Sequence, residues 1–160
     1  MNPDNDRVMR YEGVSQRGGF TLIETLIVVI IIGIVAGIAI PQVGRTLAAT
    51  RVQRASSVFA ADMQRAFSLA AQRRSPVRVS VDTAGKNFYV RNRARDTTYV
   101  MTNYGASSEL ALTQIATVDT TFVIWPNGLA EKGVTITLRA PGNARRIAVT
   151  RAGQIRITTP

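Results

Sequence analysis

One long apolar run near the N-terminus constrains this chain more than any other feature. Residues Phe20 to Ile40 read FTLIETLIVVIIIGIVAGIAI, which is 21 residues (20 to 40, inclusive) with one charged side chain, Glu24. As an α-helix this run would be about 30 Å long, which matches the hydrocarbon thickness of a bilayer. A strand of this length would far exceed the strands of globular proteins, despite the many β-branched residues. The run therefore predicts a transmembrane helix over residues 20–40.

The run contains a single carboxylate, Glu24, whose position needs an explanation. Glu24 lies about one turn from the start of the run. A charge at the bilayer centre costs on the order of 3 kcal/mol on insertion scales, and less near an interface. Glu24 therefore predicts a functional role with a positively charged partner, although a location at the membrane interface would also account for it.

The segment before the run, residues 1–19, is polar, mixed in charge and without apolar periodicity, which predicts an unfolded leader. Met9 is an alternative start that would shorten this leader to eleven residues (9 to 19, inclusive). A secretory signal peptide cleaved near Ala39 is a rival interpretation, since Gly37 and Ala39 are small. Against it, the run is longer than the usual apolar region of such a signal and contains a carboxylate.

The residues around the start of the run resemble the type III signal of the type IV pilin-like superfamily. The sequence RGGFTLIE places a leader, Gly19, the aromatic Phe20, Glu24 and the apolar run in the order and spacing of that signal. The resemblance implies that a prepilin peptidase cleaves between Gly19 and Phe20 and that the new N-terminus of Phe20 is methylated. It also implies a role in helix bending for Pro41, which stands where many pilins carry a proline.

The same resemblance implies assembly with other pilin or pseudopilin subunits into a filament. Cleavage would create a positive α-amine on Phe20, about one helical turn from Glu24. In the filament we expect the Glu24 carboxylate of one subunit to meet the Phe20 amine of its neighbour. Both charges would be buried among apolar side chains, where leaving either unpaired is costly. The pair would therefore set the register of the subunits.

Beyond the run, helical spacing continues over about Gln42 to Gln72, so residues 41–74 are expected to form an amphipathic, periplasmic part of the helix. Its apolar positions recur mostly every three or four residues: Val43, Leu47, Ala55, Phe59, Met63, Ala66 and Ala70. Pro41 removes a backbone donor, so we expect a kink or a local break there. Ser75-Pro76 is expected to end the helix.

The period drops to two from Val77 onward, which predicts a β-rich globular domain over residues 77–160. Expected strands are 77–82, 87–91, 98–102, 109–113, 120–125, 134–139, 147–149 and 155–157, separated by turns such as Pro141-Gly142-Asn143. Together these elements predict an α+β fold, with a long N-terminal helix packed on an antiparallel β-sheet or a small β-sandwich.

Composition limits the chemistry. The chain has no cysteine and no histidine, which removes disulfides, thiolate nucleophiles and the commonest metal ligand and general base. We therefore expect no enzyme activity, no metal and no cofactor. The net charge is +10, and the leader contributes nothing to it because its three acids cancel its three arginines. That charge would attract nucleic acid, anionic lipid of the inner membrane or an acidic protein, or would form a merely solvated basic surface.

The C-terminal half resembles the GspH/FimT branch of the superfamily, which comprises type II secretion pseudopilin H and the minor pilin FimT. The matching residues are Ile124, Pro126 and Gly128, followed by Gly153-Gln154-Ile155-Arg156, where Gln154 replaces the first arginine of a Gly-Arg-x-Arg element. In some FimT-like pilins this tip binds DNA. The resemblance thus implies DNA-binding candidates, namely Arg139, Arg145, Arg146, Arg151 and Arg156. Solvated edge and turn arginines are the plain alternative, and Trp125 is a candidate for base stacking or for the core.

The sequence predicts a minor pseudopilin, a structural subunit of the type II secretion pseudopilus involved in protein secretion. It would wait as a single-pass protein in the bacterial inner membrane, with its C-terminal domain in the periplasm. The alternative is a FimT-like minor type IV pilin that contributes to pilus assembly and to DNA binding and uptake. A tethered enzyme or binding module is poorly supported, because paired carboxylates and a glycine-rich phosphate loop are also missing.

Overall fold

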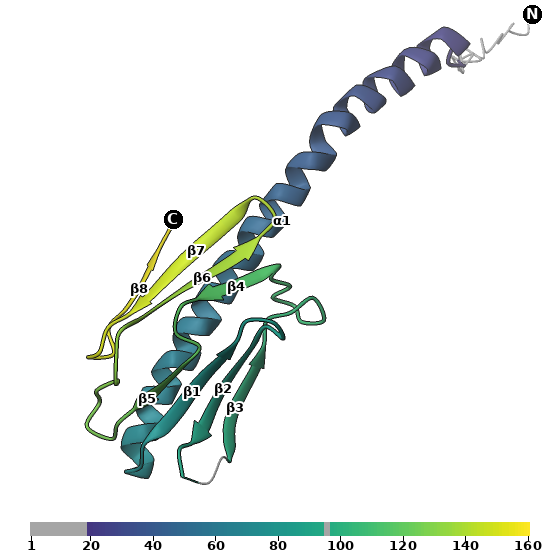
Figure 1. Ribbon diagram of the computed structural model, residues 1–160. Coiled ribbons are helices and arrows are strands. Elements are labelled where there is room, and N and C mark those ends of the chain that lie inside the picture. The colour runs from purple at the N-terminus through teal and green to yellow at the C-terminus, as the bar shows by residue number, and fades with distance from the viewer. Residues whose placement is uncertain (1–18, 95–96) are drawn as a thin grey trace, which may run out of the picture. The chain divides into compact units, whose positions relative to one another are not determined.

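The computed structural model describes residues 19–94 and 97–160, so the leader before Gly19 and part of the predicted loop at 93–96 lie outside the described residues (Figure 1). The chain divides into two compact units, Met1–Ala39 and Ile40–Pro160. The described elements, in chain order, are α1 (Leu22–Arg73), β1 (Val77–Asp82), β2 (Asn87–Asn92), β3 (Thr98–Asn103), β4 (Gln114–Thr117), β5 (Thr121–Ile124), β6 (Val134–Ala140), β7 (Asn143–Val149) and β8 (Ile155–Thr158).

Helix α1 is 52 residues long and continues through position 41. The local break that the proline could have caused is therefore absent, because one missing donor leaves the turns on either side hydrogen-bonded; the kink stays a prediction. The helix ends as expected before Pro76. Arg74 takes a left-handed conformation with φ of 48°, and its amide donates to the Ala71 carbonyl at 3.2 Å, which closes the last turn.

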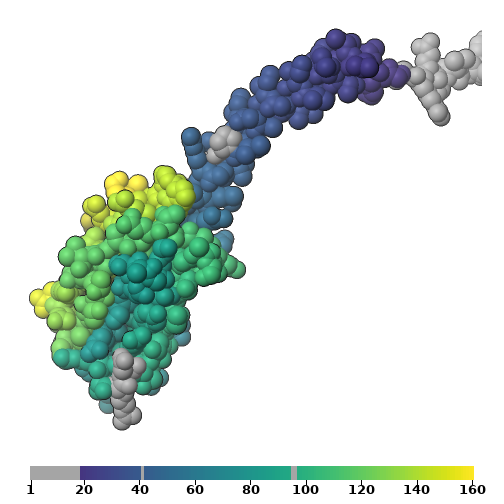
Figure 2. Space-filling model, turned by 45° about the vertical axis from the view of Figure 1, so that its right-hand side comes forward, coloured from purple at the N-terminus to yellow at the C-terminus, as the bar shows by residue number. Residues whose placement is uncertain are grey.

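The strands form two four-stranded sheets, in the orders β3-β2-β1-β5 and β4-β6-β7-β8, and every pairing is antiparallel. The prediction of a long helix followed by antiparallel sheets is thus confirmed. The β6–β7 hairpin turns at Pro141-Gly142, where Gly142 has a φ of 72° that favours glycine. In Figure 2 the later residues of the unit Ile40–Pro160, in teal to yellow, form one continuous surface on the side turned to the viewer.

One apolar core joins both sheets to the later part of α1. The helix contributes a stripe of buried side chains at three- and four-residue intervals: Val52, Ala55, Phe59, Met63, Ala66 and Ala70. Phe59 lies at the centre, with its ring 5.1 Å from that of Phe88 and 5.9 Å from that of Tyr104 between centroids. The alanines on the stripe let the sheets approach the helix backbone. This stripe holds the two sheets on one support and thereby fixes the positions of their outer faces.

The segment Glu109 to Thr113 is not a strand, so that prediction is wrong. The next strand, β4, begins directly after this segment, at Gln114. Leu110 and Leu112 are both buried, as their alternation indicates. Between them, however, Ala111 has a φ of 41°, and its amide donates to the Ser108 carbonyl at 3.2 Å. A left-handed residue cannot continue an extended strand. The alternation therefore reflects two buried leucines, Leu110 and Leu112, that hold a loop against the core.

Tyr104 fastens the start of this loop to the helix. Its side chain is fully buried, and its hydroxyl donates a hydrogen bond to Oδ2 of Asp62 on α1 at 3.0 Å. Burial, together with the neighbouring Asp62 carboxylate, raises the pKa of the Tyr104 hydroxyl well above its ordinary range. The folded state therefore favours the protonated hydroxyl, the form that donates to Asp62.

This hydrogen bond predicts an alkaline loss of stability. Above about pH 10 an unfolded tyrosine releases its proton while folded Tyr104 keeps it, so the free energy of unfolding falls as pH rises, by up to about 1.4 kcal/mol per pH unit. Tyr104→Phe should remove this contribution and cost about 1 kcal/mol at pH 7, because Asp62 loses its donor. Denaturant unfolding of the full chain between pH 7 and 11 measures both effects. Tyr89→Phe, on the outer face of β2, is the control, and an equal change in both variants would contradict the assignment.

Candidate functional site

The first turn of α1 is organised by Thr21. The Glu24 amide donates to Oγ1 of Thr21 at 3.2 Å, and the Thr25 amide donates to the Thr21 carbonyl, also at 3.2 Å. Thr21 is therefore the N-cap, and the sequence Thr-x-x-Glu has the spacing of a capping box. Sequence reasoning missed this role of Thr21, although that spacing could have shown it. The cap fixes the start of the helix at Leu22, three residues after Gly19.

The bond between Gly19 and Phe20 lies outside the helix and is accessible. Both residues are exposed, with Phe20 at 82% of its full accessibility, and neither belongs to a helix or a strand. A Cβ at Gly19 would meet no atom within 4 Å, so no part of the described chain requires a glycine there. A hydrolase that must take an extended peptide could reach this bond, whereas it could not easily cleave inside α1.

Glu24 is exposed in the first helical turn, where its negative charge is favoured by the helix dipole. Across residues 19–94 and 97–160, no basic side chain lies within ion-pair distance of Glu24. Its carboxylate thus remains available for a cation from another molecule or for the amine that cleavage would create. Pro41 lies within the same helix, seventeen positions further on (41 minus 24).

The large apolar side chains between the Thr21 cap and Arg45, the first basic residue of α1, are exposed. Their exposures run from 48% at Val28 to 86% at Leu22, and this exposure extends past the predicted span to Val43 and Leu47. Among the described elements, α1 is the one helix that is long and apolar enough to cross a membrane. An apolar surface of this extent in water marks a membrane or protein contact.

Three of the five predicted arginines share one face of the second sheet. Arg139, Arg146 and Arg156 point away from the core, on the adjacent strands β6, β7 and β8. Their registers are diagonal: Arg146 pairs with Thr137 and Thr158, two residues from Arg139 and Arg156 respectively. Side chains at diagonal positions lie about 7–8 Å apart.

This arginine diagonal (Arg139, Arg146 and Arg156) stands on a face without acidic residues. The other side chains on the outer face of the four strands are small or neutral: Gln114, Ala116, Thr135, Thr137, Ala144, Ala148 and Thr158. No carboxylate on this face therefore offsets the three charges, and the face can attract an anion.

The structure does not bring the other two predicted arginines onto this face. Arg145 pairs with Leu138, so it lies on the inner side of the sheet, where it is half-buried and donates to Oγ1 of Thr159 at 2.9 Å. Arg151 is exposed in the turn between β7 and β8. Trp125 is partly exposed at the end of β5, and the Arg93 guanidinium lies over its ring at 5.1 Å, which occupies one of its faces.

The described part of the chain contains no group of three or more His, Cys, Asp or Glu residues that could hold a metal ion. Lys132 forms an ion pair with Asp119 across the β4–β5 and β5–β6 connections, which is a structural contact at the surface.

Comparison with known proteins finds a sequence motif near the N-terminus and similar folds among solved structures. Residues 14–40 match the prokaryotic N-terminal methylation motif. A search of curated protein sequences finds no match. Two crystal structures of the type IV minor pilin FimU from Pseudomonas aeruginosa strain PAO1 are similar, with TM-scores of 0.58 and 0.55 and 17% identity. The similarity covers 69% and 68% of this chain and 93% and 96% of FimU.

The minor pseudopilin EpsH from the type 2 secretion system of Vibrio cholerae is also similar, with a TM-score of 0.48, 11% identity, and coverage of 69% of this chain and 98% of EpsH. The chain therefore carries the N-terminal methylation motif of prepilin-like proteins on a fold like that of pilin structures.

Proposed function

We propose that this protein is a filament subunit that is anchored in the bacterial inner membrane by residues 20–40 before assembly. Prepilin peptidase would cleave between Gly19 and Phe20 and the new N-terminus would be methylated. The observation that carries the proposal is the methylation motif over residues 14–40, joined to a pilin-like fold. The exposed position of the Gly19–Phe20 bond, outside the helix, supports cleavage there.

The uncovered apolar surface of α1 supports both states of such a subunit. Lipid would cover the side chains from Leu22 to Ile40 while the subunit waits in the membrane, and neighbouring helices would cover them in the filament. Glu24 would then pair with the Phe20 amine of a neighbour, since an unpaired carboxylate in that bundle would be costly.

Within this class we propose a minor pseudopilin of type II secretion, with its domain of residues 77–160 in the periplasm. The incomplete arginine element supports this choice over nucleic-acid binding. Gln154, which replaces an arginine, uses its backbone to close the turn: its amide donates to Oγ1 of Thr150 and its carbonyl accepts from the Thr150 amide at 2.9 Å. Because these contacts use the backbone, the turn does not depend on the side chain at position 154, and Gln154 leaves that side chain neutral.

The arginine diagonal favours a second candidate, a FimT-like minor pilin that binds DNA for uptake. Three guanidinium groups at successive diagonal positions on an acid-free face suit a line of phosphates. Binding of this kind is governed by counterion release, so its affinity would fall steeply with salt.

Secretion in a deletion strain separates the two candidates. We expect that removing the gene abolishes extracellular hydrolase activity and that the gene with its leader restores it. If secretion is normal and DNA uptake falls instead, the pilus function replaces the secretion function. In that case Arg139→Gln/Arg146→Gln/Arg156→Gln should weaken DNA binding and lower its salt slope by about 3, one for each lost phosphate contact. A variant of equal charge, Arg51→Gln/Arg54→Gln/Arg65→Gln on the exposed face of α1, is the control.

A further inference from the structure

The second sheet ends in an open edge at β8, the outermost strand in the order β4-β6-β7-β8 (Figure 1). Alternate residues of β8 supply its hydrogen bonds to β7. The Thr150 amide donates to the Gln154 carbonyl at 2.9 Å, so the residues two and four positions after Gln154 also bond β7. The backbone N–H and C=O groups of Ile155 and Ile157 therefore point away from the sheet, where none of the described strands pairs with them.

The edge of the first sheet at β5 differs, because the chain itself covers it. The Glu131 amide donates to the Val123 carbonyl at 2.8 Å, and Ile124 forms a bridge with Ala130. Residues 129–131 thus take the place of a neighbouring strand there. β8 has no such cover in the described part of the chain, so its edge is a template for a strand from another molecule.

The side of β8 that faces α1 is apolar and incompletely covered. On β7, Ile147 and Val149 are buried, with exposures of 0% and 3%. Their cross-strand partners on β8, Ile157 and Ile155, are only half-buried, although they pack against the same core. This difference arises because β8 has a neighbouring strand on one side alone. A further strand beside β8, with apolar side chains toward the helix, would cover both isoleucines.

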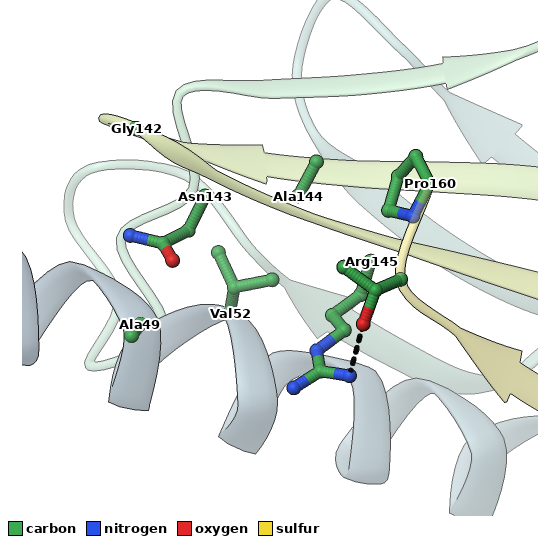
Figure 3. A pocket seen from close by; sticks show the side chains of 8 residues that line it. Ala49, Val52, Gly142, Asn143, Ala144, Arg145 and Pro160 are labelled. Atoms are coloured by element: carbon green, nitrogen blue, oxygen red, sulfur yellow. Dashed lines mark hydrogen bonds between the residues drawn. The ribbon is translucent and has the colours of Figure 1, made fainter.

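Helix α1 runs beneath the length of β8. Before the strand, a Cβ at Gly153 would lie 3.3 Å from the Phe67 ring, and after it, Thr159 and Val52 line one pocket of about 290 Å³ (Figure 3). β8 therefore follows 15 positions of α1 (67 minus 52), which is about 22 Å of helix. Phe67 is itself only half-buried. An extended segment of about six or seven residues matches this length.

The opposite side of β8 is positive. Arg156 points outward there as the last member of the arginine diagonal, and none of the described residues on that face of the four strands is acidic. A strand added at the edge would place a side chain directly opposite Arg156, where a carboxylate is favoured and a lysine is disfavoured. The short length and the charge of β8 discourage unselective pairing, so the edge selects its partner.

We propose that β8 binds an extended segment of a partner protein as a fifth strand, apolar toward α1 and acidic opposite Arg156. The added strand is antiparallel, as is every other pairing in this sheet. The segment's residues whose side chains face the helix are then the ones whose backbone groups bond Ile155 and Ile157. The partner is therefore recognised by its alternation of apolar and acidic residues. The inference goes beyond filament membership and applies to either of the two candidate functions.

An eight-residue peptide that alternates valine with glutamate tests the edge. The full chain in detergent micelles is titrated against the fluorescently labelled peptide, and anisotropy measures binding. We expect saturable binding that protects the Ile155 and Ile157 amides from hydrogen exchange. Methylation of the valine amides, which face β8, should weaken binding by about tenfold or more. Methylation of the glutamate amides, which face solvent, should leave binding unchanged.

Two substitutions in the chain test the same contacts. Ile157→Pro removes an outward donor that β7 does not use, so the sheet should stay intact while binding falls by about tenfold or more. Arg156→Gln should weaken binding of the glutamate peptide by up to about fivefold and leave a valine–threonine peptide unaffected. Arg139→Gln removes the same charge from the same face, two strands away from the edge, and is the matched control.

The other outcomes contradict the inference. Absence of saturable binding excludes strand addition, and an equal loss on methylation of valine or of glutamate amides shows that the edge is not paired as proposed. Binding that Ile157→Pro leaves intact, but that Arg156→Gln and Arg139→Gln weaken equally, assigns the peptide to the arginine face, where DNA would also bind. If Ile157→Pro does not fold, the two methylated peptides decide the question with the unaltered chain.

Discussion

Replacing Gly19 by valine should leave the leader attached to every copy of the protein. Gly19 occupies the position before the proposed cut, and a peptidase that requires glycine there would exclude a branched side chain. The protein's own structure should tolerate the change, since a Cβ at this position would meet nothing within 4 Å. The mass of the membrane-extracted protein measures the result: the unaltered chain should lose residues 1–19, and Gly19→Val should retain them.

The consequence of Gly19→Val for assembly should be as complete as its effect on processing. Without cleavage the Phe20 nitrogen stays an uncharged amide, and Glu24 has no α-amine to pair with. We expect the variant to accumulate in the membrane and to be missing from sheared filaments. Gly33→Val, further along α1 in equally open surroundings, is a matched control for the added side chain. Full processing of Gly19→Val would refute the proposed cleavage position.

Loss of the Glu24 carboxylate is expected to remove the subunit from filaments almost entirely. Two explanations of its importance differ in a testable way. As a charge it would pair with the neighbour's amine, and as the fourth residue of a capping box it would stabilise the start of α1. Glutamine can serve in a capping box but carries no charge. Alanine has no charge and cannot serve in a capping box.

The pair Glu24→Gln and Glu24→Ala therefore separates these roles. If the charge matters, both variants should be processed and inserted normally, yet both should fall by about tenfold or more in filament content, as expected when one partner of a buried ion pair is removed. If the cap matters, Glu24→Gln should assemble normally and only Glu24→Ala should fail. Immunoblots of sheared filaments against membrane fractions measure the ratio. Normal assembly of both variants would exclude any role of Glu24 in register.

The sequence predicts the elements of this fold well where periodicity is sustained. The apolar run, the helix to Arg73 and the hairpins of the second sheet are long or regular enough to be recognised locally. The loop from Tyr104 to Thr113 was not, because two buried leucines alternate there while Ala111 turns the chain through a left-handed conformation. A positive φ at a single alanine does not change the apolar pattern of the sequence, so the pattern could not predict it.

The candidate sites show the same division. Alternation alone places Arg139, Arg146 and Arg156 on the outer face, and the strand order then aligns them on a diagonal. The inward position of Arg145, whose guanidinium is directed toward α1 (Figure 3), depends on how β7 lies against the helix. Arg145 and Val52, which line the same pocket, are 93 positions apart (145 minus 52), so no local pattern could have joined them. The spacing of Thr21 to Glu24 could have predicted the cap, but the same residues belong to the processing motif, which was used to interpret them.

The early start of α1 has a consequence for how subunits exchange. Because the helix begins at Leu22, the proposed cleavage would leave two residues before it, Phe20 and the N-cap Thr21, which can extend by about 7 Å at most. The new amine would therefore stay within reach of the Glu24 carboxylate on its own chain. A subunit that joined a filament would exchange this internal partner for the carboxylate of a neighbour, and a subunit that left would exchange it back. Neither step would leave an unpaired charge in an apolar medium, so we expect growth and shrinkage of the filament to meet similar electrostatic barriers.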